Sequence, residues 1–172
     1  MDPYLLLLRF VHIVLGVFWA GAFIFIATFL LPSVRDAGPD GMKVMAALQR
    51  RRFMDIMPVV AALTIVTGLL LYWRVTHGLI PEWVTSGYGL SLGVGGVTAI
   101  IAFAIGVGIM RPAQLRAGRI AQALEVTMDQ ATRTQQQAEL AALRQRAATG
   151  ARVVAALLAI SVAGMAAARH LP

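Results

Sequence analysis

Four long apolar segments limit the folds that are open to this chain. They cover residues 5–31, 56–76, 90–110 and 150–169, and 59% of the 172 residues are hydrophobic while only 13% are charged. A helix needs about 20 residues to cross the hydrocarbon core of a bilayer. None of the segments alternates apolar and polar residues as a transmembrane β-strand does. The sequence therefore predicts an all-α integral membrane protein, a four-helix bundle that forms a single domain over residues 1–172.

The distribution of basic residues predicts the orientation of this bundle. Most of the 15 lysines and arginines lie in or beside two loops, residues 32–55 and 111–149, whereas residues 77–89 contain none. Loops rich in Lys and Arg stay on the cytoplasmic side. We therefore expect both loops to be cytoplasmic and both termini to face outward. The net charge of +7 is then explained by topology and by contact with anionic lipid, and we expect no nucleic-acid partner.

Both cytoplasmic loops are predicted to contain helix. Residues 32–55 have the pattern of a short basic amphipathic helix that lies at the lipid headgroups. Residues 113–149 are rich in Ala, Gln, Arg and Leu and contain no proline, which favours a helical hairpin with its break near residues 129–134. The second arm is expected to run into the fourth membrane helix, so that a cytoplasmic helical extension lies between helices 3 and 4. No internal repeat is evident.

The chain contains no cysteine. Disulfides, thiolate metal sites, iron–sulfur clusters and thioether attachment of haem are therefore excluded. A cofactor, if one is bound, needs other ligands.

Histidine 12 is the most informative ionisable residue, because it lies inside the longest apolar segment. Such a residue is a functional hypothesis by default, since hydrocarbon penalises polar groups that find no partner. When the helical rise per residue is counted from the cytoplasmic edges of the helices, His12, Arg74, His77 and His170 fall in one outer layer. His77 and His170 also fit the alternative role of interfacial anchors.

This layer has the side chains that a b-type haem needs. The iron of haem b takes neutral imidazole, and its propionates favour arginine. Arg9 shares a helix face with His12, as Arg74 does with His77. We expect His12 to be the first axial ligand and His77 the second, with His170 as the alternative second ligand. Arginines 9, 74 and 169 are candidates for the propionates, and Gly16 and Trp19 for contact with the ring, although Gly16 also fits ordinary helix packing.

The stretch LRFVHIVLGVFWAG at residues 8–21, followed by Phe25, Phe29 and Pro32, resembles the first helix of a group of small bacterial membrane proteins. The group comprises integral-membrane haem-binding proteins, copper-resistance-D-like proteins and membrane protoporphyrinogen-oxidase-like proteins. The resemblance covers the first membrane segment well and the rest of the chain only in general plan. It implies a bundle in the bacterial inner (plasma) membrane with His12 as haem ligand. The oxidase-like proteins also carry a functional lysine in a later membrane helix, whereas the only lysine here is Lys43, in a loop.

The sequence thus predicts a cytochrome-b-like membrane protein that acts in electron transport or haem handling near the outer face, with His12 and His77 binding the iron. An accessory structural subunit and a carrier of metal ions or small molecules are the alternatives. The expected partner is the lipid bilayer. Whether the chain also forms a homo-oligomer or joins a larger membrane complex is left open by the sequence. No catalytic residue is predicted, and whether the chain is an enzyme also stays open.

Overall fold

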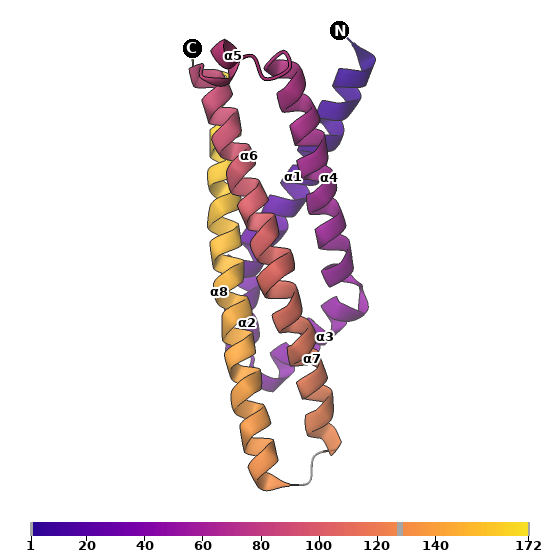
Figure 1. Cartoon of the computed structure of the whole chain (residues 1–172). Coiled ribbons are helices and arrows are strands. Elements are labelled where there is room, and N and C mark those ends of the chain that lie inside the picture. The colour runs from indigo at the N-terminus through magenta and orange to yellow at the C-terminus, as the bar shows by residue number, and fades with distance from the viewer. Residues whose placement is uncertain (1, 127–128, 172) are drawn as a thin grey trace.

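The computed structural model describes residues 2–126 and 129–171, and these residues form helices, turns and no strand. Within them, four continuous helical stretches are long and apolar enough to cross a membrane: Pro3–Asp36, Phe53–Val75, Gly87–Leu124 and Gln130–Ala168. They pack side by side as a bundle (Figure 1). The predicted all-α four-helix bundle is confirmed.

Two of the four membrane-capable stretches are made of several elements each. The first contains α1 (Pro3–Phe25), η1 (Ile26–Leu30) and α2 (Leu31–Asp36), and α3 (Gly38–Arg50) leads to α4 (Phe53–Val75). After α5 (Pro81–Val84), the third stretch contains α6 (Gly87–Ile105), η2 (Gly106–Met110) and α7 (Arg111–Val126), and α8 (Gln130–Ala168) is the fourth. We call the end where α1 begins and α8 ends the terminal end, and the end that holds α3 and the α7–α8 hairpin the basic end (Figure 1).

Two of the predicted helix ends are not ends in the structure. The segments expected to stop at residues 31 and 110 continue as helix to Asp36 and Val126. Each contains a π-helical turn, η1 or η2, that ends two residues before a proline, Pro32 or Pro112. A proline lacks the N–H that an α-helix requires, and its ring collides with the carbonyl four residues earlier. We attribute the wider π-helical turn to this conflict, which it relieves without breaking the helix.

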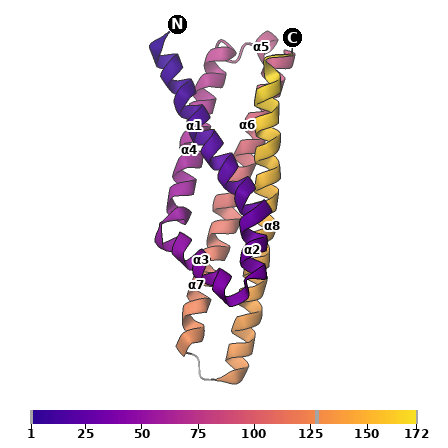
Figure 2. The ribbon, with the colours of Figure 1, turned by 180° about the vertical axis from the view of Figure 1, so that it is seen from behind.

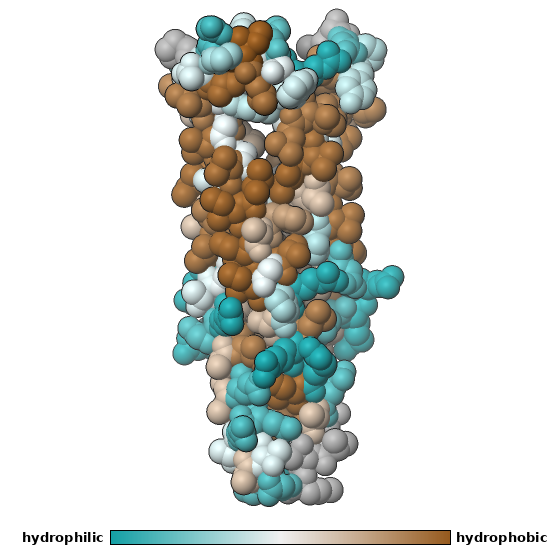
Figure 3. Space-filling model, in the orientation of Figure 1, coloured by the Kyte–Doolittle hydropathy of each residue, from teal (hydrophilic) through white to brown (hydrophobic). Residues whose placement is uncertain are grey.

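The predicted helical extension between the third and fourth membrane helices is present. Helix α7 ends at Val126, and α8 runs without interruption for 39 residues from Gln130. The second arm of the hairpin therefore does continue into the fourth membrane helix. The break begins slightly earlier than predicted, and its residues 127 and 128 lie outside the described part. The surface changes from apolar to polar along this length (Figure 3).

The two helix pairs of the bundle, α1 with α4 and α6 with α8, share a plan that we did not detect in the sequence. The pentapeptide VVAAL occurs at residues 59–63 in α4 and at 153–157 in α8. Its second and third residues are buried in both copies, as Val60 and Ala61 and as Val154 and Ala155. Both α1 and α6 lead into a π-helical turn and then a proline. The two helix pairs thus share these local features. Leu92 precedes Pro112 by the same number of residues as His12 precedes Pro32. The second helix pair therefore has a leucine where the first has His12.

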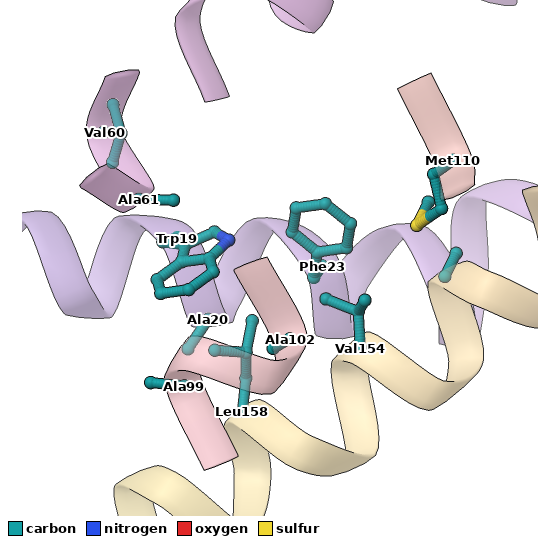
Figure 4. Packing of buried hydrophobic residues seen from close by; sticks show 11 residues of the cluster. Trp19, Ala20, Phe23, Val60, Ala61, Ala99, Ala102, Met110, Val154 and Leu158 are labelled. Atoms are coloured by element: carbon teal, nitrogen blue, oxygen red, sulfur yellow. The ribbon is translucent and has the colours of Figure 1, made fainter. Parts of the chain in front are cut away.

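Small side chains fill much of the core. Trp19 and Phe23 of α1 pack among Ala61, Ala99, Ala102, Val154 and Leu158 of the other three helices (Figure 4). Seen from behind, α1 crosses the bundle from the side of α4 toward α8 (Figure 2). Alanines at these positions let the backbones come close enough for that crossing.

Candidate functional site

The His12 ring lies between α1 and α4. Its Nδ1 atom is 2.9 Å from the carbonyl oxygen of Thr64 and 3.2 Å from the hydroxyl oxygen of Thr67. A carbonyl oxygen can only accept, so Nδ1 carries the proton and donates it. The Thr67 hydroxyl is itself a donor to the carbonyls of Leu63 and Thr64, which leaves its lone pairs to accept from His12. In the neutral ring, Nε2 then keeps a free lone pair.

A glycine of α4, Gly68, lets the His12 ring approach this helix. A Cβ atom on Gly68 would lie 2.8 Å from Cε1 of His12, which is closer than a real side chain tolerates. One turn along α1 from His12, a Cβ on Gly16 would lie 3.5 Å from the Thr64 methyl group. Gly16 therefore belongs to the packing contact between α1 and α4, the alternative role noted for it above.

His12 and His77 lie at different heights in the bundle. Thr64 and Gly68, which contact His12, are in the middle of α4, whereas His77 follows its C-terminal end. The nine residues from Gly68 to His77 span about 14 Å at the rise of an α-helix. We missed this difference from the sequence because we counted residues from Leu31 and Ile56 as if both were helix ends at the same height. In the structure, helix continues past Leu31 to Asp36, so the two residues are not equivalent starting points.

His77 lies in a tight turn at the terminal end. His77, Gly78 and Leu79 all have positive φ angles, of 50°, 86° and 68°. The buried Thr76 hydroxyl supports the turn, since it donates to the Tyr72 carbonyl and accepts from the Leu79 N–H. The exposed His77 ring contacts Trp83, with 4.8 Å between ring centroids. This setting is typical of residues at a membrane–water interface.

The remaining predicted residues are arranged around the terminal end and the core. His170 is exposed and accepts a hydrogen bond from Nε of Arg169 at 3.2 Å. Arg9 and Arg74 are also exposed, and both lie on the terminal side of His12 along their helices. Trp19 is only 3% exposed and contacts side chains of the core. The structure thus groups His12 with Gly16, and it gives His77, His170 and Trp19 other neighbours.

Three residues of this site, Thr64, Thr67 and Gly68, were not predicted. They lie in the sequence TIVTG, in the apolar middle of α4. Polar or small residues of this kind mark helix contacts in membranes. That signal was available, but it does not say which helix or side chain is the partner.

The described residues contain no group of three or more His, Cys, Asp or Glu that could hold a metal ion. A bare transition-metal ion usually takes several protein donors. Haem iron needs only one or two, because the porphyrin supplies the others.

Comparison with protein-family models, with curated proteins and with solved structures finds no match to this chain.

Proposed function

We propose that this chain is a multi-pass protein of the bacterial inner membrane that binds haem b through Nε2 of His12 and serves electron transfer or haem handling. The observation that carries the proposal is the hydrogen bond from His12 Nδ1 to the Thr64 carbonyl. Histidines that bind metals through one ring nitrogen commonly donate the other N–H to a carbonyl or carboxylate, which sets the tautomer and the ring orientation.

Other residues near His12 suit the same cofactor. The Thr64 carbonyl and the Thr67 hydroxyl hold the imidazole in one orientation. Arg9 is one helical turn from His12, and Arg74 is six residues, about 9 Å, from Gly68 toward the terminal end. Their guanidinium groups would bind the propionates. When bound, the haem supplies an iron that can be reduced and oxidised.

Because His77 and His170 lie at the terminal end, we propose His12 as the only histidine that binds the haem iron. His77 was predicted as the second ligand, but its tilted contact with the Trp83 ring and its distance from His12 along α4 favour an interfacial role. We therefore expect a five-coordinate haem, or one with a small molecule as its sixth ligand.

An accessory subunit without a cofactor is the second candidate, and the same hydrogen bond supports it. His12 donates to Thr64 and Thr67 of the neighbouring helix, so it would link α1 to α4 whether or not Nε2 binds iron. The two candidates differ in what occupies Nε2.

Absorption spectra of the full chain separate these candidates. The protein should be purified in mild detergent, loaded with haemin and recorded oxidised and dithionite-reduced. We expect a Soret band that His12→Ala abolishes and that His77→Ala leaves unchanged in position and intensity. Wild-type protein that takes up no haem, or His12→Ala with full haem content, would contradict the proposal. Wild-type protein that takes up no haem, together with a loss of stability in His12→Ala, would instead favour the accessory subunit.

A further inference from the structure

A groove of about 170 Å³ lies between η2 and α7 on one side and α8 on the other. Its apolar part is formed by Gly108, Ile109, Pro112, Ala113 and Leu143, and two arginines, Arg116 and Arg146, complete its lining. The groove is at the basic end, so it is separate from the region around His12.

The position of the groove matches the headgroup layer of a bilayer. The apolar segment of the third membrane helix ends at Met110, and Arg116 lies six residues beyond it, about 9 Å along the helix. The headgroup layer is about 5–7 Å thick on each side, and an arginine can reach back toward it with its flexible stem. This part of the molecule has a largely polar surface just below the apolar belt (Figure 3).

The charges in the groove favour an anion. Arg116 pairs with the carboxylate of Glu139, which offsets part of its charge. Arg146 forms no ion pair with a carboxylate of the described residues. The pair of arginines therefore has an uncompensated positive charge next to an apolar surface. A Cβ atom on Gly108 would meet no atom within 4 Å, so the apolar end of the groove is open.

We infer that this groove binds an anionic phospholipid. Its phosphate lies between Arg116 and Arg146, and one acyl chain passes Gly108 and Ile109 toward the bilayer. Neither a zwitterionic lipid nor free phosphate matches both halves of the groove, because the first lacks net negative charge and the second lacks an acyl chain.

Native mass spectrometry of the full chain in detergent, titrated with phosphatidylglycerol or phosphatidylcholine, tests the inference. Basic residues near a membrane surface strengthen the binding of anionic lipid. We therefore expect Arg116→Gln/Arg146→Gln to weaken phosphatidylglycerol binding at least about tenfold. The control Arg133→Gln/Arg144→Gln removes the same charge from α8 at two positions that do not line the groove, so it should leave phosphatidylglycerol binding unchanged.

Two single variants test the two halves of the groove separately, one the charged half and one the apolar half. Glu139→Gln releases Arg116 from its ion pair and should strengthen binding. Gly108→Leu fills the apolar end without a change in charge and should weaken it. The inference is wrong if both double variants weaken binding equally, if phosphatidylcholine binds as well as phosphatidylglycerol, or if inorganic phosphate displaces the lipid.

Discussion

His12 can lie between two apolar helices because its ring finds partners in the neighbouring helix. The Thr64 carbonyl already belongs to the backbone of α4, but a carbonyl oxygen has two lone pairs and can accept a second hydrogen bond. The Thr64 hydroxyl donates within its own helix, to the Val60 carbonyl at 2.8 Å. The polar groups around His12 are thus satisfied without water, as the membrane interior requires.

A methyl group at position 68 should disturb this arrangement. Gly68→Ala puts a Cβ atom 2.8 Å from the His12 ring, so the ring has to move away from Thr64. Overpacking of this kind costs about 1–3 kcal/mol. We expect a lower unfolding midpoint in detergent and a shifted haem spectrum. Gly21→Ala is the control, since its added methyl group meets nothing within 4 Å. Equal effects of both variants would argue against the contact.

At the other end of the molecule, Asp129 caps the first turn of α8. Its carboxylate accepts from the Thr132 N–H at 2.8 Å, and hydrogen bonds from the hydroxyl and the N–H of Thr132 lower the pKa of Asp129. Because the folded state has the lower pKa, the stabilisation is present at neutral pH and is lost as the pH falls through that lowered pKa.

Hydrogen exchange at residues 130–133 measures this effect. We expect the protection factors of these amides to fall in acid in the wild type. Asp129→Asn keeps a good N-cap residue but cannot titrate, so its protection should stay constant with pH. A wild type and an Asp129→Asn variant whose protection factors respond to acid in the same way would disprove the prediction.

At the scale of elements, α6 and α8 are joined by two reciprocal hydrogen bonds. The Ser91 hydroxyl donates to the Gly164 carbonyl, and the Ser161 hydroxyl donates to the Gly95 carbonyl, both at 2.7 Å. Glycines allow this approach, since a Cβ on Gly95 would lie 3.0 Å from the Ser161 carbonyl. The corresponding contact between α1 and α4 uses His12 and two threonines. The two helix pairs thus share a packing plan but differ in chemistry.

Removal of both hydroxyls should weaken the α6–α8 pair. Interhelical hydrogen bonds in membranes contribute about 0.6 kcal/mol each on average, so Ser91→Ala/Ser161→Ala should lower the free energy of unfolding by about 1 kcal/mol. Unfolding with sodium dodecyl sulfate in mixed micelles measures this change. Ser33→Ala, at an exposed serine, is the control and should have no effect. A double variant as stable as this control would show that the hydroxyls do not hold the helices together.

At the scale of the whole molecule, the start of α1 and the end of α8 lie at one end. The helix α3 and the arginine-rich α7–α8 hairpin lie toward the other end (Figure 1). Since basic segments stay in the cytoplasm, a periplasm-active reporter fused to the C-terminus should be active. The same reporter inserted into the loop between α7 and α8 should be inactive. A cytoplasmic reporter should show the reverse pattern at both sites. Cytoplasmic activity at the C-terminus would overturn the proposed orientation.

Local patterns in the sequence determined the helices of this protein. Hydropathy over the length of a membrane span was enough to find the four membrane-capable helices, and composition was enough to find the helical hairpin between the last two. His12 was also evident, because an ionisable residue in an apolar run needs no structure to be noticed.

Only the tertiary structure decided what His12 contacts and at which height it lies. Thr64, Thr67 and Gly68 are far from His12 in sequence, and their contact with it depends on how α1 is tilted and rotated against α4. The sequence alone also does not determine what happens at Pro32 and Pro112. Each proline could end a helix or be accommodated within it by a π-helical turn. Tilt, rotation and such adjustments result from the packing of all helices together, and no single segment contains that information.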